Sequence, residues 1–260
     1  MNKLKFSEDR VRIVLMANDV VGLGVTNFLV NRNENIVCVF VHNEENQKMS
    51  TEIIRASGVD YSDIYFASEL KNSNTVDILR EYKPDVIITC YWAHLLSPEI
   101  IRIPKYGCIN FHPALLPLNR GWYPSVWPFI DGTKAGVTLH LIDEGADTGD
   151  VLAQYEMDIK ETDTAGTVYE RSKRLILAMF KQTWLRLYDQ GIYPIKQDHA
   201  KATYHTKKEG NALNEIDMER SYKAKDLINL LRSRTFGDKT FAFYKKDNDI
   251  YQVKVVITKG

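Results

Sequence analysis

Short apolar runs that alternate with helical segments are the feature that most constrains the fold of this chain. The apolar runs are continuous, which is typical of strands buried on both faces of a sheet. The predicted strands span residues 11–17, 36–41, 64–66 and 85–90, and the predicted helices 22–29, 52–57 and 75–82. This order predicts a Rossmann-like α/β fold with a twisted, mostly parallel sheet and ligands beyond the carboxyl ends of its strands.

The remaining two thirds of the chain change in character twice. A strand at residues 107–111 leads into a proline-rich segment, and loops of this kind are usually functional. Further strands at 137–142 and 151–157 and a long amphipathic helix at 166–190 follow, and then a helix at 224–232 and a hairpin of 241–244 with 250–256. We expect one large α/β domain over residues 1–205 and a small C-terminal α+β appendage with a hairpin over residues 206–260.

The charge balance and the apolar stretches exclude several classes of partner. Lys plus Arg and Asp plus Glu both number 34, so no overall field attracts a nucleic acid or a membrane. No stretch approaches the roughly 18 apolar residues that cross a bilayer. Cys38, Cys90 and Cys108 lie far apart in strand-like runs and indicate buried side chains. We therefore expect a cytoplasmic protein with no metal site, no nucleic acid and no membrane as partner.

A glycine pair after the first predicted strand offers one reading of the function. A strand that leads through Gly22-x-Gly24 into a helix suggests a dinucleotide-binding turn. A full fingerprint would have a third glycine at Asn27, so a tight strand-to-helix turn is the simpler explanation. A nicotinamide-dependent oxidoreductase stays open as an alternative from a different reaction class.

The segment from residue 107 to residue 154 carries a far more specific pattern. Its matching positions are Asn110-Phe-His112, Leu115-Leu-Pro117, Arg120-Gly121, Pro124, Trp127, Gly132, Gly136-Val-Thr-Leu-His140 and Asp147-Thr-Gly149-Asp150. This pattern closely resembles the 10-formyltetrahydrofolate-dependent formyltransferase family. Weaker agreement extends over residues 11–101.

Three side chains in this segment suit acyl transfer on chemical grounds. Asn110 and His112 are two apart on a strand and point to the same face. An amine that attacks a formyl carbon creates an oxyanion, which an amide and an imidazole can stabilise. Asp147 can orient the imidazole or relay the proton that the amine loses. We predict these three residues to be catalytic, while His140 could support the site or only the strand.

The resemblance also implies a folate site and suggests residues for the acceptor. It implies N10-formyltetrahydrofolate as co-substrate, with the pterin between the backbone of Asp143, Glu144, Gly145 and Ala146 on one side and Trp92, Ala93 and His94 on the other. The residues expected to contact the acceptor are Tyr91, Arg120, Trp122 and Tyr123. The remaining histidines, His42, His199 and His205, are expected on the surface or in ordinary core.

The C-terminal appendage bears on which amine is formylated. Residues 206–260 hold 12 Lys plus Arg against 8 Asp plus Glu, a mild excess for a tRNA-binding module. Residues 216–236 resemble the region after the catalytic domain of sugar-nucleotide N-formyltransferases. We expect an acceptor that is a nucleotide-linked amino-dideoxy sugar, in the first place dTDP-4-amino-4,6-dideoxyglucose, used in O-antigen or lipopolysaccharide biosynthesis. Glycinamide ribonucleotide and methionyl-tRNA formyltransferases remain alternatives.

The apolar side chains of the predicted hairpin also suggest an oligomeric state. An isolated two-stranded hairpin is marginal in water unless its apolar face is covered. A second copy of the chain could cover it through a two-fold interface. We therefore expect a homodimer with the appendage at or near the interface.

Overall fold

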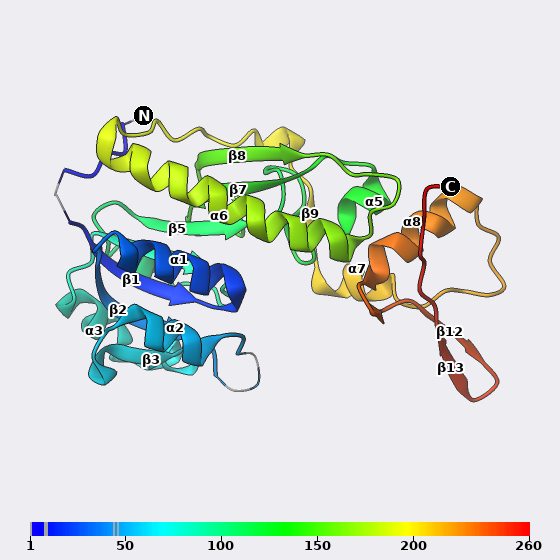
Figure 1. Ribbon diagram of the computed structural model, residues 1–260, viewed down its shortest axis with the longest axis horizontal. Helices are drawn as coiled ribbons and strands as arrows, with labels where there is room; N and C mark the ends of the chain where they lie inside the picture. The colour runs from blue at the N-terminus through cyan, green and yellow to red at the C-terminus, as the bar shows by residue number, and fades with distance from the viewer. Residues whose placement is uncertain (1, 8–9, 44, 46) are drawn as a thin grey trace. The chain divides into compact units, whose positions relative to one another are not determined.

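The computed structural model describes residues 2–7, 10–43, 45 and 47–260 and divides into two compact units (Figure 1). The first unit comprises Met1–His112, Thr138–Ala153 and Arg174–Gln197. The second comprises Pro113–Val137, Gln154–Lys173 and Asp198–Gly260. The division between residues 205 and 206 that we expected from the sequence stays a prediction.

A seven-stranded sheet is the largest one among the described residues (Figure 1). Its strands are β1 (Arg12–Ala17), β2 (Asn35–Val41), β3 (Ile64–Phe66), β4 (Val86–Cys90), β5 (Cys108–His112), β7 (Ala135–Leu141) and β8 (Val151–Met157). They follow the order β3-β2-β1-β4-β5-β7-β8, parallel from β3 to β5, with β7 antiparallel to β5. The predicted fold, a mostly parallel Rossmann-like sheet, is confirmed. Chain order reverses between β1 and β4, the position at which such sheets usually bind ligands.

Helices cover both faces of this sheet within the first unit. They are α1 (Asp19–Asn31), α2 (Ser50–Ser57), α3 (Thr75–Glu81), α4 (Pro98–Ile101) and the second half of α6 (Ala165–Asp189), with 3-10 turns at Tyr61–Asp63 and Ala67–Lys71. Because strand side chains alternate, Met16, Phe40 and Cys108 share one face, where they pack with Leu79 of α3 and Ile100 of α4. On the other face, Phe180 of α6 meets both Phe28 of α1 and Phe111 of β5.

The two glycines after β1 serve helix packing. Helix α1 begins at Asp19, so Gly22 and Gly24 lie inside it, whereas the sequence suggested that the helix starts at Gly22. A Cβ on Gly24 would lie 2.7 Å from a methyl of Leu177, so the glycine lets α1 approach α6. The buried Asp19 carboxylate accepts a hydrogen bond from the N–H of Val20, where a dinucleotide fold would place a phosphate. This arrangement does not support the oxidoreductase alternative.

The second unit contains the shorter elements. They are β6 (Arg120–Gly121), α5 (Trp127–Asp131), the first half of α6, the turn at His199–Lys201, β9 (Tyr204–His205), α7 (Lys207–Ala212), α8 (Ala224–Arg234), β10 (Thr235–Phe236), β11 (Lys239–Thr240), β12 (Phe243–Lys246) and β13 (Asp249–Gln252). Its apolar cluster combines Trp127 and Phe129 of α5 with Ala165 and Val168 of α6. Of these elements, the sequence analysis missed α5, α7 and the two-residue strands.

The predicted hairpin is present as β12 and β13. The strands pair from Phe243↔Gln252 to Lys246↔Asp249, so a two-residue turn with Asp247 at a φ of +56° joins them. Asp at such a φ is typical of hairpin turns. Tyr244 and Tyr251 stack across the ladder with ring centroids 5.2 Å apart, while Ile250 is 64% exposed. In the described part of the chain, no helix has the length and apolar composition to span a membrane.

Candidate active site

Strand pairing brings the predicted catalytic residues of β5 next to a second histidine. Asn110 and His112 lie on β5, and Asn110 stands opposite His140 of β7 in the antiparallel ladder. Thr89 occupies the matching position on β4, on the other side of Asn110. Since residues directly opposite in a ladder share a face, these four side chains gather on the sheet face that also carries α3 and α4.

Hydrogen bonds fix the orientation of the Asn110 amide. The hydroxyl of Thr89 donates to Asn110 Oδ1 over 2.8 Å, and Asn110 Nδ2 lies 3.1 Å from His140 Nε2. His140 Nδ1 lies 2.7 Å from the carbonyl of Leu141, which can only accept, so this nitrogen carries a hydrogen. In neutral His140, Nε2 then accepts from Asn110. The amide nitrogen therefore keeps a second hydrogen for donation to a bound oxygen.

Asp147 lies between the two imidazoles. Its carboxylate oxygens are each 3.5 Å from a ring nitrogen, one from His112 Nδ1 and the other from His140 Nε2. The side chain is 16% exposed, and both histidines are buried. Distances of this length are common in ligand-free sites, where catalytic hydrogen bonds shorten on substrate binding.

The backbone around Asp147 is held in an uncommon conformation. Asp147 has a φ of +55°, a left-handed conformation that costs energy for a non-glycine residue. The buried Gln197 side chain donates from Nε2 to the carbonyl of Asp147 over 2.9 Å and to that of Gly149 over 2.6 Å. At Gly149, a Cβ would lie 1.9 Å from the Leu141 carbonyl oxygen, so only glycine fits. Sequence reasoning missed Gln197 because it lies 50 residues from Asp147.

The two acidic side chains of the loop before Asp147 are held by contacts with other residues. Asp143 Oδ1 accepts from the N–H of Gly145 over 3.1 Å and from the hydroxyl of Thr148 over 2.5 Å. Glu144 pairs with Arg102 over 2.5 Å. The structure thus places Asp143–Ala146 directly before Asp147, as a short closed loop that could bind the polar edge of a flat ligand.

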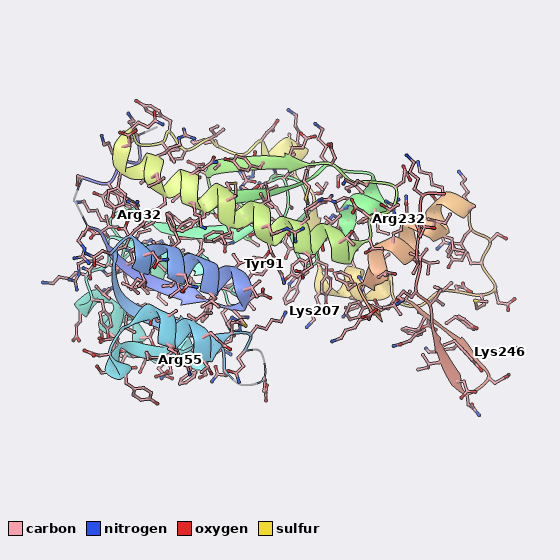
Figure 2. The ribbon with its side chains drawn as sticks, in the orientation of Figure 1. Arg32, Arg55, Tyr91, Lys207, Arg232 and Lys246 are labelled. Atoms are coloured by element: carbon pink, nitrogen blue, oxygen red, sulfur yellow. The ribbon has the colours of Figure 1, made fainter. Side chains whose placement is uncertain are left out.

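The segment after β4 meets a histidine that the sequence did not single out. Tyr91 follows β4 directly with a φ of +52° (Figure 2), and Ala93 lies between Trp92 and His94. His42, directly after β2, is 2% exposed, with its ring centroid 4.5 Å from that of Trp92 and 5.2 Å from that of His94. Burial, and then the nearby His94, lowers the pKa of His42 to about 4. His42 is thus buried at the carboxyl edge of the sheet, which agrees with the expected core position.

The three residues expected to contact the acceptor from the proline-rich segment lie in the second unit. Arg120 is buried, and its guanidinium is 3.3 Å from Nδ1 of His199, which is exposed as expected. Trp122 is 44% exposed, with the ammonium of Lys207 5.1 Å from its ring, and Tyr123 donates to Asn211. An exposed indole beside a cation suits a flat or anionic ligand. The structure therefore brings Arg120, Trp122 and Tyr123 together with His199 and Lys207.

The last histidine that lacked a pattern in the sequence is packed in the same unit. His205 stacks on Trp127 with ring centroids 3.7 Å apart and lies 3.2 Å from the Asp131 carboxylate. Burial lowers its pKa, while the charge of Asp131 opposes that shift. These contacts identify His205 as a core residue, which agrees with the expectation.

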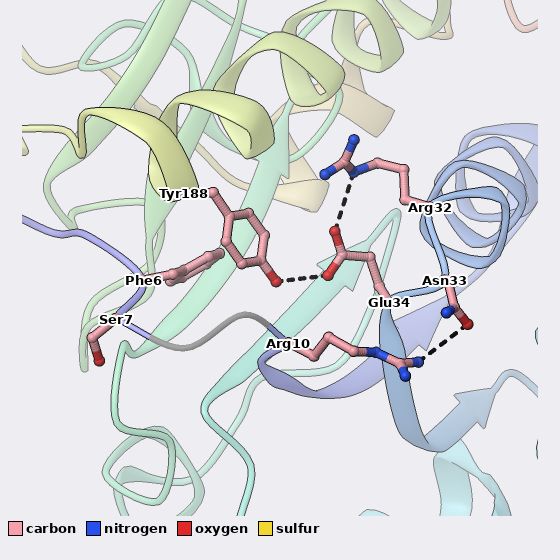
Figure 3. A pocket seen from close by; sticks show the side chains of 7 residues that line it. All are labelled: Phe6, Ser7, Arg10, Arg32, Asn33, Glu34 and Tyr188. Carbon is pink, nitrogen blue, oxygen red and sulfur yellow. Dashed lines mark hydrogen bonds and ion pairs between the residues drawn. The ribbon is translucent and has the colours of Figure 1, made fainter.

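One hollow of about 420 Å³ lies near the amino-terminal end of β2 (Figure 3). Its central carboxylate, Glu34, accepts from Trp184 over 2.9 Å, from Tyr188 over 2.6 Å and from Arg32 over 3.1 Å. Three donors satisfy this buried acid, so it joins the start of β2 to α6 and has a structural role.

Comparison with known proteins gives the family of the chain. The model of the formyl transferase family matches residues 10–182, and that of the N-formyltransferase dimerization C-terminal domain matches residues 209–259. A methionyl-tRNA formyltransferase from Acetivibrio thermocellus is 34% identical over 179 residues, which cover 68% of this chain and 57% of that protein. The chain thus spans only about half the length of the first curated relatives that it matches.

Two solved structures have a similar fold. A sugar N-formyltransferase from Shewanella sp. matches with a TM-score of 0.82 at 23% identity, over 96% of this chain and 99% of that one. A formyltransferase from Anoxybacillus kamchatkensis, in complex with UDP-4,6-dideoxy-4-formamido-L-AltNAc and tetrahydrofolate, matches with a TM-score of 0.56 at 25% identity, over 77% of this chain and 88% of that one. Because the family model covers most of the chain, the sheet and the site described above belong to a member of the formyl transferase family.

Proposed function

We propose that this protein transfers a formyl group from N10-formyltetrahydrofolate to the amine of a nucleotide-linked amino-dideoxy sugar. The observation that carries the proposal is the arrangement of Asn110 and His112 on one sheet face, with the Asp147 carboxylate 3.5 Å from His112 Nδ1, in a chain of this family. Among candidate acceptors, dTDP-4-amino-4,6-dideoxyglucose is the one that we would test first. Such a product would serve surface polysaccharide synthesis.

The first task of the site is to stabilise negative charge. The amine attacks the formyl carbon, and the carbonyl oxygen becomes an oxyanion in a tetrahedral intermediate. Asn110 can donate its second Nδ2 hydrogen to that oxygen, because Thr89 and His140 hold the amide in one orientation. A preorganised donor of this kind is typically worth about 10²–10³ in kcat.

The second task is to move a proton from the attacking amine to the departing folate nitrogen. His112 Nδ1 faces Asp147, and we propose that Nε2 is the nitrogen that exchanges the proton with the reacting groups. When Nε2 takes the proton, the Asp147 carboxylate stabilises the resulting imidazolium. His112 can then return the proton to the folate nitrogen as the C–N bond of the tetrahedral intermediate breaks.

For the donor, we propose that the backbone of Asp143–Ala146 pairs with the pterin. The two acidic side chains of this loop are held by Gly145, Thr148 and Arg102, which leaves backbone groups for a neutral heterocycle. The backbone of Trp92, Ala93 and His94 would bound the opposite side. The Anoxybacillus formyltransferase, whose structure holds tetrahydrofolate, supports a folate donor.

Two observations support a sugar nucleotide as the acceptor. The fold of the Shewanella sugar N-formyltransferase extends over almost the whole of both chains, including the C-terminal appendage. The Anoxybacillus formyltransferase is described with a UDP-linked formamido sugar. In this chain we propose Tyr91 and the group of Arg120, Trp122 and Tyr123 as residues that contact the acceptor.

Methionyl-tRNA is the second candidate acceptor, because curated relatives of this chain carry that activity in their names. Against it stands the appendage, whose 12 basic and 8 acidic residues give only a mild positive charge. Binding of tRNA through phosphates would require a more basic surface.

We also propose that the protein is a homodimer through its appendage. The match to a dimerization domain over residues 209–259 supports this state, as does the exposed hairpin, in which Ile250 and Tyr251 are 64% and 43% exposed. A two-fold interface would cover both copies of these side chains.

The reaction can be tested with purified full-length protein, N10-formyltetrahydrofolate and a panel of nucleotide-linked amino sugars. Mass spectrometry should show one acceptor that gains a single carbonyl group, with tetrahydrofolate formed in equal amount and no nicotinamide required. If folate is consumed at the same rate with and without every acceptor of the panel, the proposal is wrong.

A further inference from the structure

Thr89 places a hydroxyl in β4, a strand that is otherwise apolar and is buried along its whole length. Its side chain is 2% exposed. Two residues earlier on the same face of the strand stands Ile87, which belongs to the apolar cluster of that face. A hydroxyl in such surroundings costs free energy unless it forms a hydrogen bond. The partner of this hydroxyl therefore indicates what Thr89 does.

The partner of Thr89 is the amide oxygen of Asn110. The hydroxyl has one hydrogen to donate, with Asn110 Oδ1 at 2.8 Å and the Ile109 carbonyl at 3.2 Å. Hydrogen bonds from a hydroxyl to an oxygen are usually about 2.5–3.0 Å long, so the hydrogen goes to Asn110. The two residues stand opposite each other in the parallel ladder of β4 and β5, so the backbone maintains their separation. Thr89 thus anchors the oxygen end of the Asn110 amide.

His140 determines which end of that amide is the donor. Asn110 Nδ2 lies 3.1 Å from His140 Nε2, and His140 Nδ1 lies 2.7 Å from the Leu141 carbonyl. Because a carbonyl only accepts, the hydrogen of the neutral ring stays on Nδ1, and Nε2 must accept. A reversed amide would place its oxygen against Nε2 with no hydrogen between them. The hydrogen bonds therefore run in one direction, from Thr89 through Asn110 and His140 to the Leu141 carbonyl.

The direction of these hydrogen bonds bears on the oxyanion of the proposed reaction. His140 uses one Nδ2 hydrogen of Asn110, which leaves the second for the oxygen of the formyl group. The position of that second hydrogen depends on the rotation of the amide, which Thr89 restrains at the oxygen end. A preorganised donor is effective because it does not have to reorient during the reaction. Without its anchor the amide would be free to turn, and the donor would be misplaced.

We infer that Thr89 is a positioning residue for formyl transfer and acts on the reaction through the Asn110 amide. This inference rests on the proposed role of Asn110 as the oxyanion donor. Thr89 is buried, and its hydroxyl contacts lie within the sheet, so its loss should not change the binding of either substrate. Its loss should instead slow the chemical step.

The test is a double-mutant cycle on full-length protein, with N10-formyltetrahydrofolate and the most active acceptor of the panel. Thr89→Val removes the hydroxyl and keeps the branched shape, whereas Thr89→Ser keeps the hydroxyl. Thr89→Val is also combined with Asn110→Ala. Thr26→Val is the matched control, because the Thr26 hydroxyl is also buried and donates to the Gly22 carbonyl over 2.8 Å. Thermal unfolding of each variant measures any loss of stability separately from the loss of turnover.

We expect Thr89→Val to lower kcat about tenfold with both KM values unchanged, which corresponds to one neutral hydrogen bond. Thr89→Ser should keep most of the native kcat, and Thr26→Val should leave kcat unchanged. In the Asn110→Ala background, Thr89→Val should lower kcat no further, because the two side chains act as a unit.

Three results would overturn the inference: native kcat in Thr89→Val, an equal loss in the presence and absence of the Asn110 side chain, or a loss in Thr89→Ser as large as that in Thr89→Val. If Asn110→Ala itself turns over near the native rate, the proposed oxyanion donor is wrong, and the inference fails with it. A slow Asn110→Ala beside a native Thr89→Val would instead reject the positioning role alone.

Discussion

Acid should destabilise this protein through His42, and the effect can be isolated by substitution. The unfolded chain binds a proton at this ring with a pKa near 6.5, whereas in the folded protein burial lowers the pKa to about 4. Between these values the unfolded state binds more protons, so the stability contributed by the neutral ring is present above pH 6.5 and is lost as the pH falls towards 4. Linkage gives a loss of about 2 kcal/mol between pH 7 and pH 5.

The assay is urea unfolding at pH 7 and pH 5, followed by tryptophan fluorescence, for wild type and His42→Phe. His94 and His205 also have lowered pKa values and contribute to the pH dependence of stability in both proteins. The difference in pH dependence between wild type and variant therefore reports the contribution of His42. The free energy of unfolding of wild type should fall by about 2 kcal/mol more than that of the variant. Parallel pH dependence of the two proteins would refute the reasoning, because it would mean that His42 is already charged or exposed in the folded state.

The remaining predictions concern catalysis and assembly. His112→Ala should lower kcat by about 10²–10³ without unfolding the protein, and near-native turnover would remove His112 from the mechanism. Gln197→Ala should lower kcat by up to about 100-fold with KM for folate unchanged, since it frees the turn that positions Asp147, and a matching change in KM alone would contradict that role. Ile250→Glu should convert a dimer into monomers in sedimentation, with Arg55→Glu on the exposed side of α2 as the control outside residues 209–259, and a monomeric wild type would refute the dimer. The value of kcat/KM should rise from about pH 6 towards mildly alkaline pH because the attacking amine must be neutral, and a steady fall would contradict the mechanism.

The sequence predicted the sheet well because its strands are buried on both faces. Continuous apolar runs such as that around Val86–Cys90 are typical of buried strands. The short strand β3 was predicted at its observed bounds, Ile64–Phe66. The start of α1 was misplaced because Asp19, at a φ of +63°, begins the helix before the glycines. Helices α4 and α5 are too short, at four and five residues, to show a helical period.

The site residues that lie on one strand could be predicted from the sequence. Those that depend on contacts between distant segments could not. Asn110 and His112 share a strand, so their common face follows from the period of two. The contact of Gln197 with the Asp147 turn and that of His42 with Trp92 join segments 50 residues apart, and only the sheet order brings such segments together. Buried polar side chains of this kind give no periodic signal.

The most direct test of the central claim compares acceptors under one set of conditions. With N10-formyltetrahydrofolate saturating, kcat/KM should be measured for dTDP-4-amino-4,6-dideoxyglucose, for other nucleotide-linked amino sugars and for methionyl-tRNA. We predict that a nucleotide-linked amino sugar is formylated with a kcat/KM far above that of methionyl-tRNA, and that Asn110→Ala abolishes most of this activity. Efficient formylation of methionyl-tRNA, with no turnover of any amino sugar, would contradict it.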